Sequence, residues 1–331
     1  ALTGYGNGHL NAAGTHVLTF LLLARECGAE VPYHTLERAL RHFYRYAGRG
    51  NNPYGDDRPF TGFVDNGKNG KLAFAMAAAA ALTPEGEASV YEHLRRSLNR
   101  LHEDRGAHGL NLVFYGDWND SLTGVCREGR GESVWLSMAF CRSCLILADV
   151  AEKVGKLEDA EAYRLWHAEM SEAINAHAWD GRWYICALDD NANPIGSKQN
   201  DEGKIFLNMQ SWAQLGKVVT EERWEQAWGS VGEMLDSGWG LMLNWPAYTK
   251  YVHNVGRLSS IRPGAAENAS VYTHGNAFML LALLERGMAD EAYQLWQSVQ
   301  PGNPERPVLN QPNVFFNVPV KFNELSMFCI S

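Results

Sequence analysis

The sequence predicts an all-α fold, a toroid built from helical hairpins that is either complete or partial. Three observations support this class: amphipathic segments follow one another in pairs, short loops alternate with long ones, and strand-like segments are rare and short. Apolar residues make up 46% of the 331-residue chain, which is enough for a large core. We therefore expect one toroid domain over 1–331, with a divergent helical part at 1–84 and a core at 85–317.

Helical spacing of apolar residues, followed by Gly or Pro stop signals, defines the predicted helices. The first three span 10–26, 34–46 and 71–82. The later ones span 89–103, 132–154, 157–178, 207–215, 221–235, 270–285 and 290–299. Segments 183–187 and 193–196 are predicted to form a small hairpin. In such a toroid the long loops gather at one end, where they can build a functional site.

Composition and charge narrow the function classes. The net charge of −9 argues against a nucleic-acid or anionic-membrane partner. The chain opens on no signal peptide and has no run of about 18 apolar residues, so we expect a cytoplasmic protein outside the membrane. The six cysteines fit no disulfide framework, and Cys141 and Cys144 lie in an apolar helix without a second Cys/His pair. We expect buried free thiols there, no metal site and no cofactor.

The segment FYGDWNDSL at 114–122 allows two interpretations. In the first it is a turn, because Asp and Asn side chains accept backbone N–H bonds and Gly116 permits positive φ. A calcium loop is disfavoured, since Trp118 and Ser121 interrupt the alternation of ligands. In the second it is a sugar-cleaving loop, because glycosidic cleavage needs a carboxylic acid of raised pKa and burial against tryptophan raises such a pKa. The residues alone leave both interpretations open.

Several ordered motifs accompany this segment. They are GDWND at 116–120, GESVW at 131–135, ENASVYTH at 267–274, EAY at 291–293, QPGN at 300–303 and QPNV at 311–314. Over 89–317 the chain thereby resembles the inverting glycoside phosphorylases of glycoside hydrolase family 94, which include cellobiose, chitobiose and cellodextrin phosphorylases.

The resemblance implies an (α/α)6 barrel and a reaction. Inorganic phosphate, the co-substrate, attacks the anomeric carbon of a β-linked gluco-disaccharide or oligosaccharide and gives an α-sugar 1-phosphate. It implies that Asp120 is the general acid, that Trp118 helps form the sugar subsite and that His274 binds phosphate. A homodimer is expected on the same ground.

Other candidate residues carry structural alternatives. Expected substrate-binding residues are Asp117, Glu132, Glu267, Tyr272 and Asn317, and Arg130 is an expected phosphate ligand. Glu132 is equally an acidic residue at a helix N-terminus, and Arg130 a solvated loop residue. Trp239, Trp245 and Tyr248 are either sugar platforms or a cover for the barrel rim.

The chain also departs from the family pattern. The family carries an F-R-D-x-x-Q-D segment before DWND, whereas 1–84 resembles a different, uncharacterised helical bacterial family. The family's T-G-[ST]-A segment has no counterpart in 318–331, and Asn317 stands where the family has Gln. Two alternatives follow: an inverting hydrolase with Glu132, Asp201 or Glu267 as base, and an inactive scaffold or glycan-binding protein.

Overall fold

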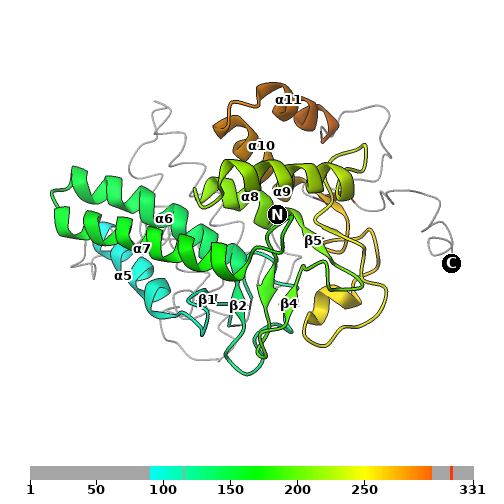
Figure 1. Ribbon diagram of the computed structural model, residues 1–331, viewed down its shortest axis with the longest axis horizontal. Coiled ribbons are helices and arrows are strands. Elements are labelled where there is room, and N and C mark those ends of the chain that lie inside the picture. Colours follow the sequence, from blue (N-terminus) through cyan, green and yellow to red (C-terminus); the bar gives the residue numbers. More distant parts are fainter. Residues whose placement is uncertain (1–89, 115, 300–313, 316–331) are drawn as a thin grey trace, which may run out of the picture. The chain divides into compact units, whose positions relative to one another are not determined.

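A computed structural model describes residues 90–114, 116–299 and 314–315 (Figure 1). The predicted helices 10–26, 34–46 and 71–82 and the candidate Asn317 lie outside these residues. The chain divides into two compact units, 1–99 and 100–331. Helix α5 (Val90–Glu103) begins in the first unit. In this helix Glu92 forms ion pairs with Arg95 and Arg96, both at 2.7 Å.

The second unit is built from helical hairpins, as predicted. Its helices are α6 (Val134–Lys153), α7 (Leu157–His177), α8 (Leu207–Leu215), α9 (Glu221–Met234), α10 (Thr273–Glu285) and α11 (Ala289–Ser298), with a 3-10 turn η1 (Gly256–Ser260). Helices α6, α8 and α10 form an inner row, in which α8 packs on both neighbours (Figure 1). Helices α7, α9 and α11 each pack on one inner helix. Burial follows this order, since eight of nine residues are buried in α8 and four of twenty-one in α7.

The structure corrects the prediction of an all-α fold, because it also contains short strands. The described strands are β1 (Asn111–Leu112), β2 (Glu132–Ser133), β3 (Ala187–Leu188), β4 (Pro194–Ile195), β5 (Ile205–Phe206), β6 (Asn244–Trp245), β7 (Val271–Tyr272) and β8 (Val314–Phe315). All pair antiparallel, in the orders β1-β2-β3-β4, β5-β6 and β7-β8. The pairing of β3 with β4 confirms the predicted hairpin.

Each inner helix begins directly after a strand. Strand β2 leads into α6, β5 into α8 and β7 into α10. The predicted helix starts at 132 and 270 are therefore wrong, because residues 132–133 and 271–272 pair with neighbouring strands in extended conformation. Each inner helix thus starts from a strand that is paired within its own small sheet.

A polar clip recurs in the first turn of each inner helix. Its residues are Ser137 in α6, Gln210 in α8 and Asn276 in α10. Each accepts a backbone N–H from the preceding connection, at 2.8, 3.0 and 2.8 Å, and donates to the carbonyl four residues earlier, at 2.7, 3.0 and 2.9 Å. The accepted N–H groups belong to Asn111, Tyr184 and Leu241. The clip bonds each inner helix to the chain that leads into it, and leaves no buried amide of the clip without a partner.

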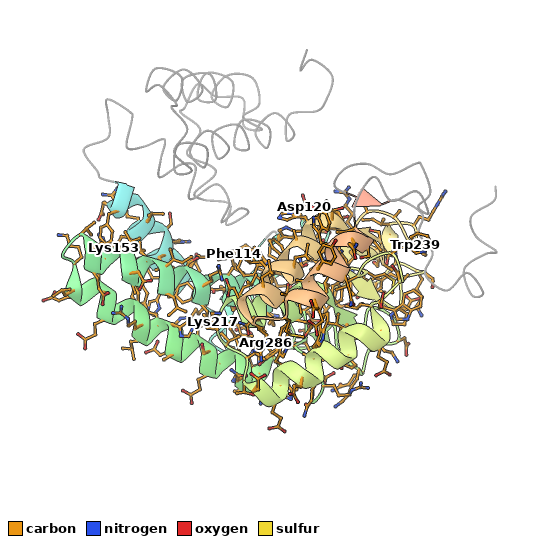
Figure 2. All side chains as sticks on the ribbon, turned by 90° about the horizontal axis from the view of Figure 1, so that it is seen from above. Phe114, Asp120, Lys153, Lys217, Trp239 and Arg286 are labelled. Carbon is orange, nitrogen blue, oxygen red and sulfur yellow. The ribbon has the colours of Figure 1, made fainter. Side chains whose placement is uncertain are left out.

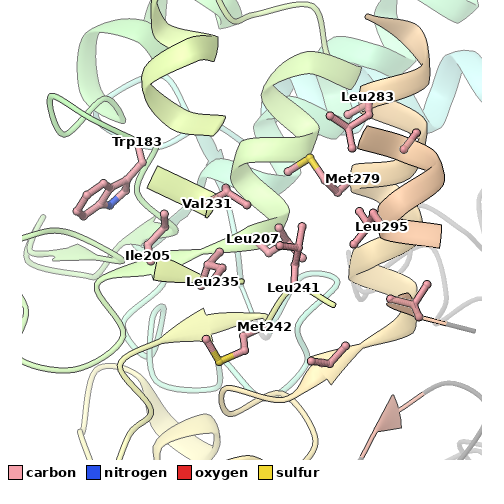
Figure 3. Close-up of a cluster of buried hydrophobic side chains, with 14 of the residues drawn as sticks. Trp183, Ile205, Leu207, Val231, Leu235, Leu241, Met242, Met279, Leu283 and Leu295 are labelled. Carbon is pink, nitrogen blue, oxygen red and sulfur yellow. The ribbon is translucent and has the colours of Figure 1, made fainter. Parts of the chain in front are cut away.

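The core lies between α8, α9, α10 and α11 (Figure 3). Leu207, Leu235, Met279 and Leu283 are fully or almost fully buried there. Burying one such side chain contributes about 1.5–3 kcal/mol. Helix α6 is apolar and long enough to cross a bilayer by length and composition, but 61% of its most apolar window is buried. Its packing on α7 and α8 is that of a core helix.

The cysteine prediction is confirmed for the described residues. Cys141 and Cys144 are free and buried in α6. Burial raises the pKa of Cys141 to about 12, so its thiol stays protonated at neutral pH.

Candidate active site

Part of the 114–122 loop is a braced turn. Asp117 Oδ1 accepts the N–H of Asn119 at 2.8 Å, and Asn119 Oδ1 accepts the N–H of Ser121 at 3.2 Å. Asp117 Oδ2 accepts the hydroxyl of Ser133 at 2.5 Å, and Ser133 caps α6 by accepting the N–H of Leu136. Asp117 is 5% exposed, and burial raises the pKa of its carboxyl against these hydrogen bonds. The turn interpretation therefore describes Asp117 and Asn119, whose side chains hold the loop on the mouth of α6.

Asp120 behaves differently from the other loop residues. Its side chain is exposed, which corrects the expectation that tryptophan buries it. Within the described residues no hydrogen bond or ion pair engages its carboxylate. After burial and the charge of Glu267, the charge of Asp120 contributes to the raised pKa of Tyr272. Figure 2 labels Asp120 among the side chains of the described residues. The loop thus braces one carboxylate and presents the other.

Trp118 joins the loop to helix α10. Its indole Nε1–H donates to Nδ1 of His274 at 3.1 Å, across 156 residues of sequence. Because an indole N–H is only a donor, Nδ1 of His274 must be an acceptor. The imidazole in this bond is therefore neutral, with its proton on Nε2, which makes Nε2–H a donor group.

Aromatic rings enclose this bond. The Trp118 ring meets the rings of Tyr272 at 5.5 Å, His274 at 5.3 Å and Phe278 at 5.9 Å, all edge to face. His274 and Phe278 also touch, with ring centroids 4.5 Å apart. Such contacts restrict the orientation of both the indole and the imidazole.

A second carboxylate lies beside Asp120. Ser121 Oγ–H donates to Oε2 of Glu267 at 3.0 Å. Burial, together with the charges of Glu267 and Asp120, raises the pKa of Tyr272 to about 12. The structure therefore gathers five predicted site residues into one group, namely Trp118, Asp120, Glu267, Tyr272 and His274.

Besides Asp117, which braces the turn, two predicted site residues do not join this group. Glu132 is 2% exposed, and its carboxylate accepts the backbone N–H groups of His108 at 3.1 Å and Leu110 at 3.2 Å, with Nδ1 of His108 at 2.5 Å. These bonds brace the turn before β1. Arg130 is exposed, bonded to Glu128 at 2.5 Å and to the backbone oxygen of Asp190 at 3.0 Å.

The structure adds residues that sequence reasoning missed. A cavity of about 10 Å³ lies behind Trp118, lined in part by Trp135 and Asn208. Within the described residues, Trp135 Nε1 and Asn208 Oδ1 are buried polar atoms without a partner. The cavity has room for about one water molecule. This space is too small for a sugar ring.

Trp135 and Asn208 could have been identified from their position relative to the strand before each inner helix. Trp135, Asn208 and His274 each stand two positions after the strand that precedes an inner helix. In the sequence they close the segments GESVW, KIFLN and SVYTH. Equivalent positions on three neighbouring helices project toward the same region. Among the described residues no group of three or more His, Cys, Asp or Glu side chains is placed to hold a metal ion.

Comparison with models of known protein families shows to which family the chain belongs. The model of the glycosyl hydrolase 94 superfamily catalytic domain matches residues 67–313. The chain belongs to this superfamily. The resemblance predicted from the DWND and ENASVYTH motifs is thereby confirmed. A second family model, a domain of unknown function (DUF6288), matches residues 1–129 and overlaps the first.

Several curated relatives of the chain are phosphorylases. The chain is 36% identical over 220 residues to the 3-O-beta-D-glucopyranosyl-beta-D-glucuronide phosphorylase of Paenibacillus borealis, covering 66% of the chain and 28% of that relative. It is 37% identical over 241 residues to the solabiose phosphorylase of the same organism, covering 72% and 31%. The N,N'-diacetylchitobiose phosphorylase of Vibrio proteolyticus is 34% identical over 220 residues, covering 66% and 27%. The aligned region spans less than a third of the length of each of these relatives.

Proposed function

We propose that this chain carries out inverting phosphorolysis of a β-linked gluco-disaccharide or oligosaccharide, with Asp120 as general acid and inorganic phosphate as nucleophile. One observation carries the proposal. An exposed carboxylate with no partner among the described residues lies in the same residue group as the Trp118–His274 hydrogen bond, in a chain of the glycosyl hydrolase 94 superfamily. We also propose that α6, α8 and α10 belong to the inner ring of a complete (α/α)6 barrel.

Asp120 supplies the proton. Protonated Asp120 donates to the glycosidic oxygen as the bond from that oxygen to the anomeric carbon breaks. An oxygen of hydrogen phosphate forms the new bond to the anomeric carbon from the opposite face, so the configuration inverts. The proton of the phosphate returns to Asp120, and the products are a free sugar hydroxyl and an α-sugar 1-phosphate. No second carboxylate is needed, because phosphate requires no base of the kind that activates water.

Trp118 and His274 position the reactants. The sugar ring lies on the open side of Trp118, where an apolar ring face suits the C–H face of a pyranose. The neutral His274 donates its Nε2–H to a phosphate oxygen, and its Nδ1 is held by Trp118. Position and tautomer of the phosphate donor thus depend on the same indole that contacts the sugar.

An assay with and without phosphate tests the proposal. We expect α-sugar 1-phosphate, detected by ³¹P NMR, from a disaccharide panel that includes cellobiose, N,N'-diacetylchitobiose and solabiose. Asp120→Asn should lower kcat by roughly 10²–10⁴-fold. Its matched control is Asp190→Asn, which alters a carboxylate that braces the loop at Glu128 and Arg130.

The same assay separates the alternatives. Hydrolysis that proceeds equally without phosphate would replace the proposal by an inverting hydrolase, with Glu267 as base because Ser121, which follows Asp120 in the chain, donates to its carboxylate. Binding of cellobiose without turnover in either direction would indicate a glycan-binding protein. Glu267→Gln distinguishes the first two outcomes, because it abolishes hydrolysis but removes no proton donor needed for phosphorolysis.

A further inference from the structure

A second cavity is lined by none of the five grouped residues Trp118, Asp120, Glu267, Tyr272 and His274. It has a volume of about 220 Å³ and is formed by the loops around Glu202 and Tyr248. It shares no lining residue with the cavity behind Trp118. A water molecule needs only about 10–15 Å³ of such space, so this cavity admits a larger ligand.

One buried polar atom of this cavity has no partner in the described part of the chain. Glu202 Oε2 is buried without a partner, whereas its Oε1 accepts both the N–H (3.1 Å) and the hydroxyl of Thr249. A buried polar group left unpaired costs about 1–3 kcal/mol. This oxygen therefore favours an occupant that donates a hydrogen bond. Tyr248, which is 3% exposed, also lines the cavity.

The walls of the cavity are held in place. The backbone of Tyr248 is bonded on both sides to the amide of Asn268, at 2.9 and 2.8 Å. Asn254 donates to Asp189 at 2.8 Å. Gly203 has φ +60°, and a Cβ there would lie 2.1 Å from the Tyr248 hydroxyl. These contacts hold the backbone of Tyr248 and limit the space on the Gly203 side of its phenol.

The chemistry of the lining selects the ligand class. Acceptors are the carboxylates of Asp201 and Glu202, and donors are the ammonium of Lys250 and the hydroxyl of Tyr248. Ile195, Val252 and Val255 supply an apolar wall. The ammonium disfavours a cation and the two carboxylates disfavour phosphate. Mixed donors and acceptors beside an apolar wall suit a neutral ring that carries several hydroxyls.

We propose that this cavity binds one neutral pyranose unit, and is therefore a second saccharide site separate from the Asp120 group. Glu202 Oε2 accepts a sugar hydroxyl, the Tyr248 hydroxyl contacts a second one, and the C–H face of the ring lies against Val252 and Val255. The site needs no phosphate and no turnover.

Hydrogen exchange measured by mass spectrometry on the full chain tests the site with D-glucose. For a ligand of twelve non-hydrogen atoms we expect a dissociation constant on the order of 1 mM. Saturating glucose should protect peptides covering 199–204 and 246–256. Tyr248→Phe and Glu202→Gln should each weaken this protection roughly 3–10-fold, as loss of one hydrogen bond does.

Matched controls keep the result specific. Glu233→Gln and Tyr293→Phe alter an exposed Glu and an exposed Tyr elsewhere, and should leave the protection unchanged. Three outcomes would overturn the proposal: no protection of these peptides, protection confined to 117–122 and 272–278, or protection by calcium chloride but not by glucose. Phosphorolysis is assayed separately, so failure of this site and failure of the Asp120 mechanism remain distinguishable.

Discussion

The indole of Trp118 and the imidazole of His274 are bonded at 3.1 Å, which ties the 114–122 loop to the first turn of α10. The loop itself is tied to the first turn of α6 through Asp117 and Ser133. Two inner helices therefore hold the loop at two adjacent residues, Asp117 and Trp118, and Asp120 follows two positions after the second attachment.

Replacing Trp118 by Phe removes the donor to His274 while keeping an aromatic ring. We expect the KM for phosphate to rise about 10-fold with a smaller change in kcat, because His274 loses the bond that fixes its tautomer. Initial-rate kinetics at varied phosphate measure this. Trp135→Phe is the matched control, since its indole N–H has no partner within the described residues. Equal effects of the two variants on the phosphate KM would contradict the assigned role.

Substituting Asp117 should mainly lower stability, whereas substituting Asp120 should mainly lower activity. Asp117→Ala removes a buried acceptor of bonds from Asn119 and Ser133, so we expect a loss of about 1–3 kcal/mol in unfolding free energy. Asp120→Ala alters an exposed side chain and should change stability by less than about 0.5 kcal/mol while activity falls. Urea unfolding monitored by circular dichroism measures both. A destabilised Asp120→Ala would show that this carboxylate also braces the loop.

Removing the clip side chain of α10 should lower the free energy of unfolding, although this side chain is uncharged. Asn276→Ala leaves the backbone N–H and carbonyl of Leu241 unpaired, and should cost about 1–3 kcal/mol. Gln297→Ala, on the exposed face of α11, is the control and should be nearly neutral. Thermal unfolding of both variants checks the difference, and similar melting temperatures would argue that the clip is dispensable.

Glu285 should make stability depend on acid pH. Burial acts to raise its pKa, but Lys217 at 2.8 Å and Arg142 at 3.0 Å outweigh burial and lower the pKa below its ordinary value of 4.5. A depressed carboxyl pKa stabilises the fold above the unfolded value, and this contribution is lost as pH falls through the folded pKa. Glu285→Gln should therefore lower stability near pH 7 and flatten the decline below about pH 4.5. Urea unfolding at several pH values measures this, with the exposed pair member Glu233→Gln as control.

Sequence periodicity predicted the helices of the described region because each carries an apolar face several turns long. Helix α8 was predicted with its observed bounds, since a strand precedes it and Gly216 follows it. The strand residues 132–133 and 271–272 were assigned to helices because two-residue strands are too short to show alternation. Their extended conformation depends on pairing with residues distant in sequence, such as Leu188.

Site residues that belong to a motif could be predicted from the sequence. Features that depend on the three-dimensional arrangement of side chains could not. Trp118, Asp120 and His274 follow from the motifs. The exposure of Asp120 does not, because it depends on Asp117 and Asn119 taking the backbone bonds of the turn. Glu132 resembles an active-site carboxylate in sequence, yet it binds backbone N–H groups contributed by the chain before β1.

The three clips have a consequence for how such a molecule tolerates change. Ser137, Gln210 and Asn276 each align one inner helix with the chain that leads into it, without using a group from the hairpin that follows. A length change in one connecting loop is thus absorbed locally, and the register of the adjoining module is preserved. The loops at the helix mouths can therefore vary while the scaffold beneath them keeps the same construction.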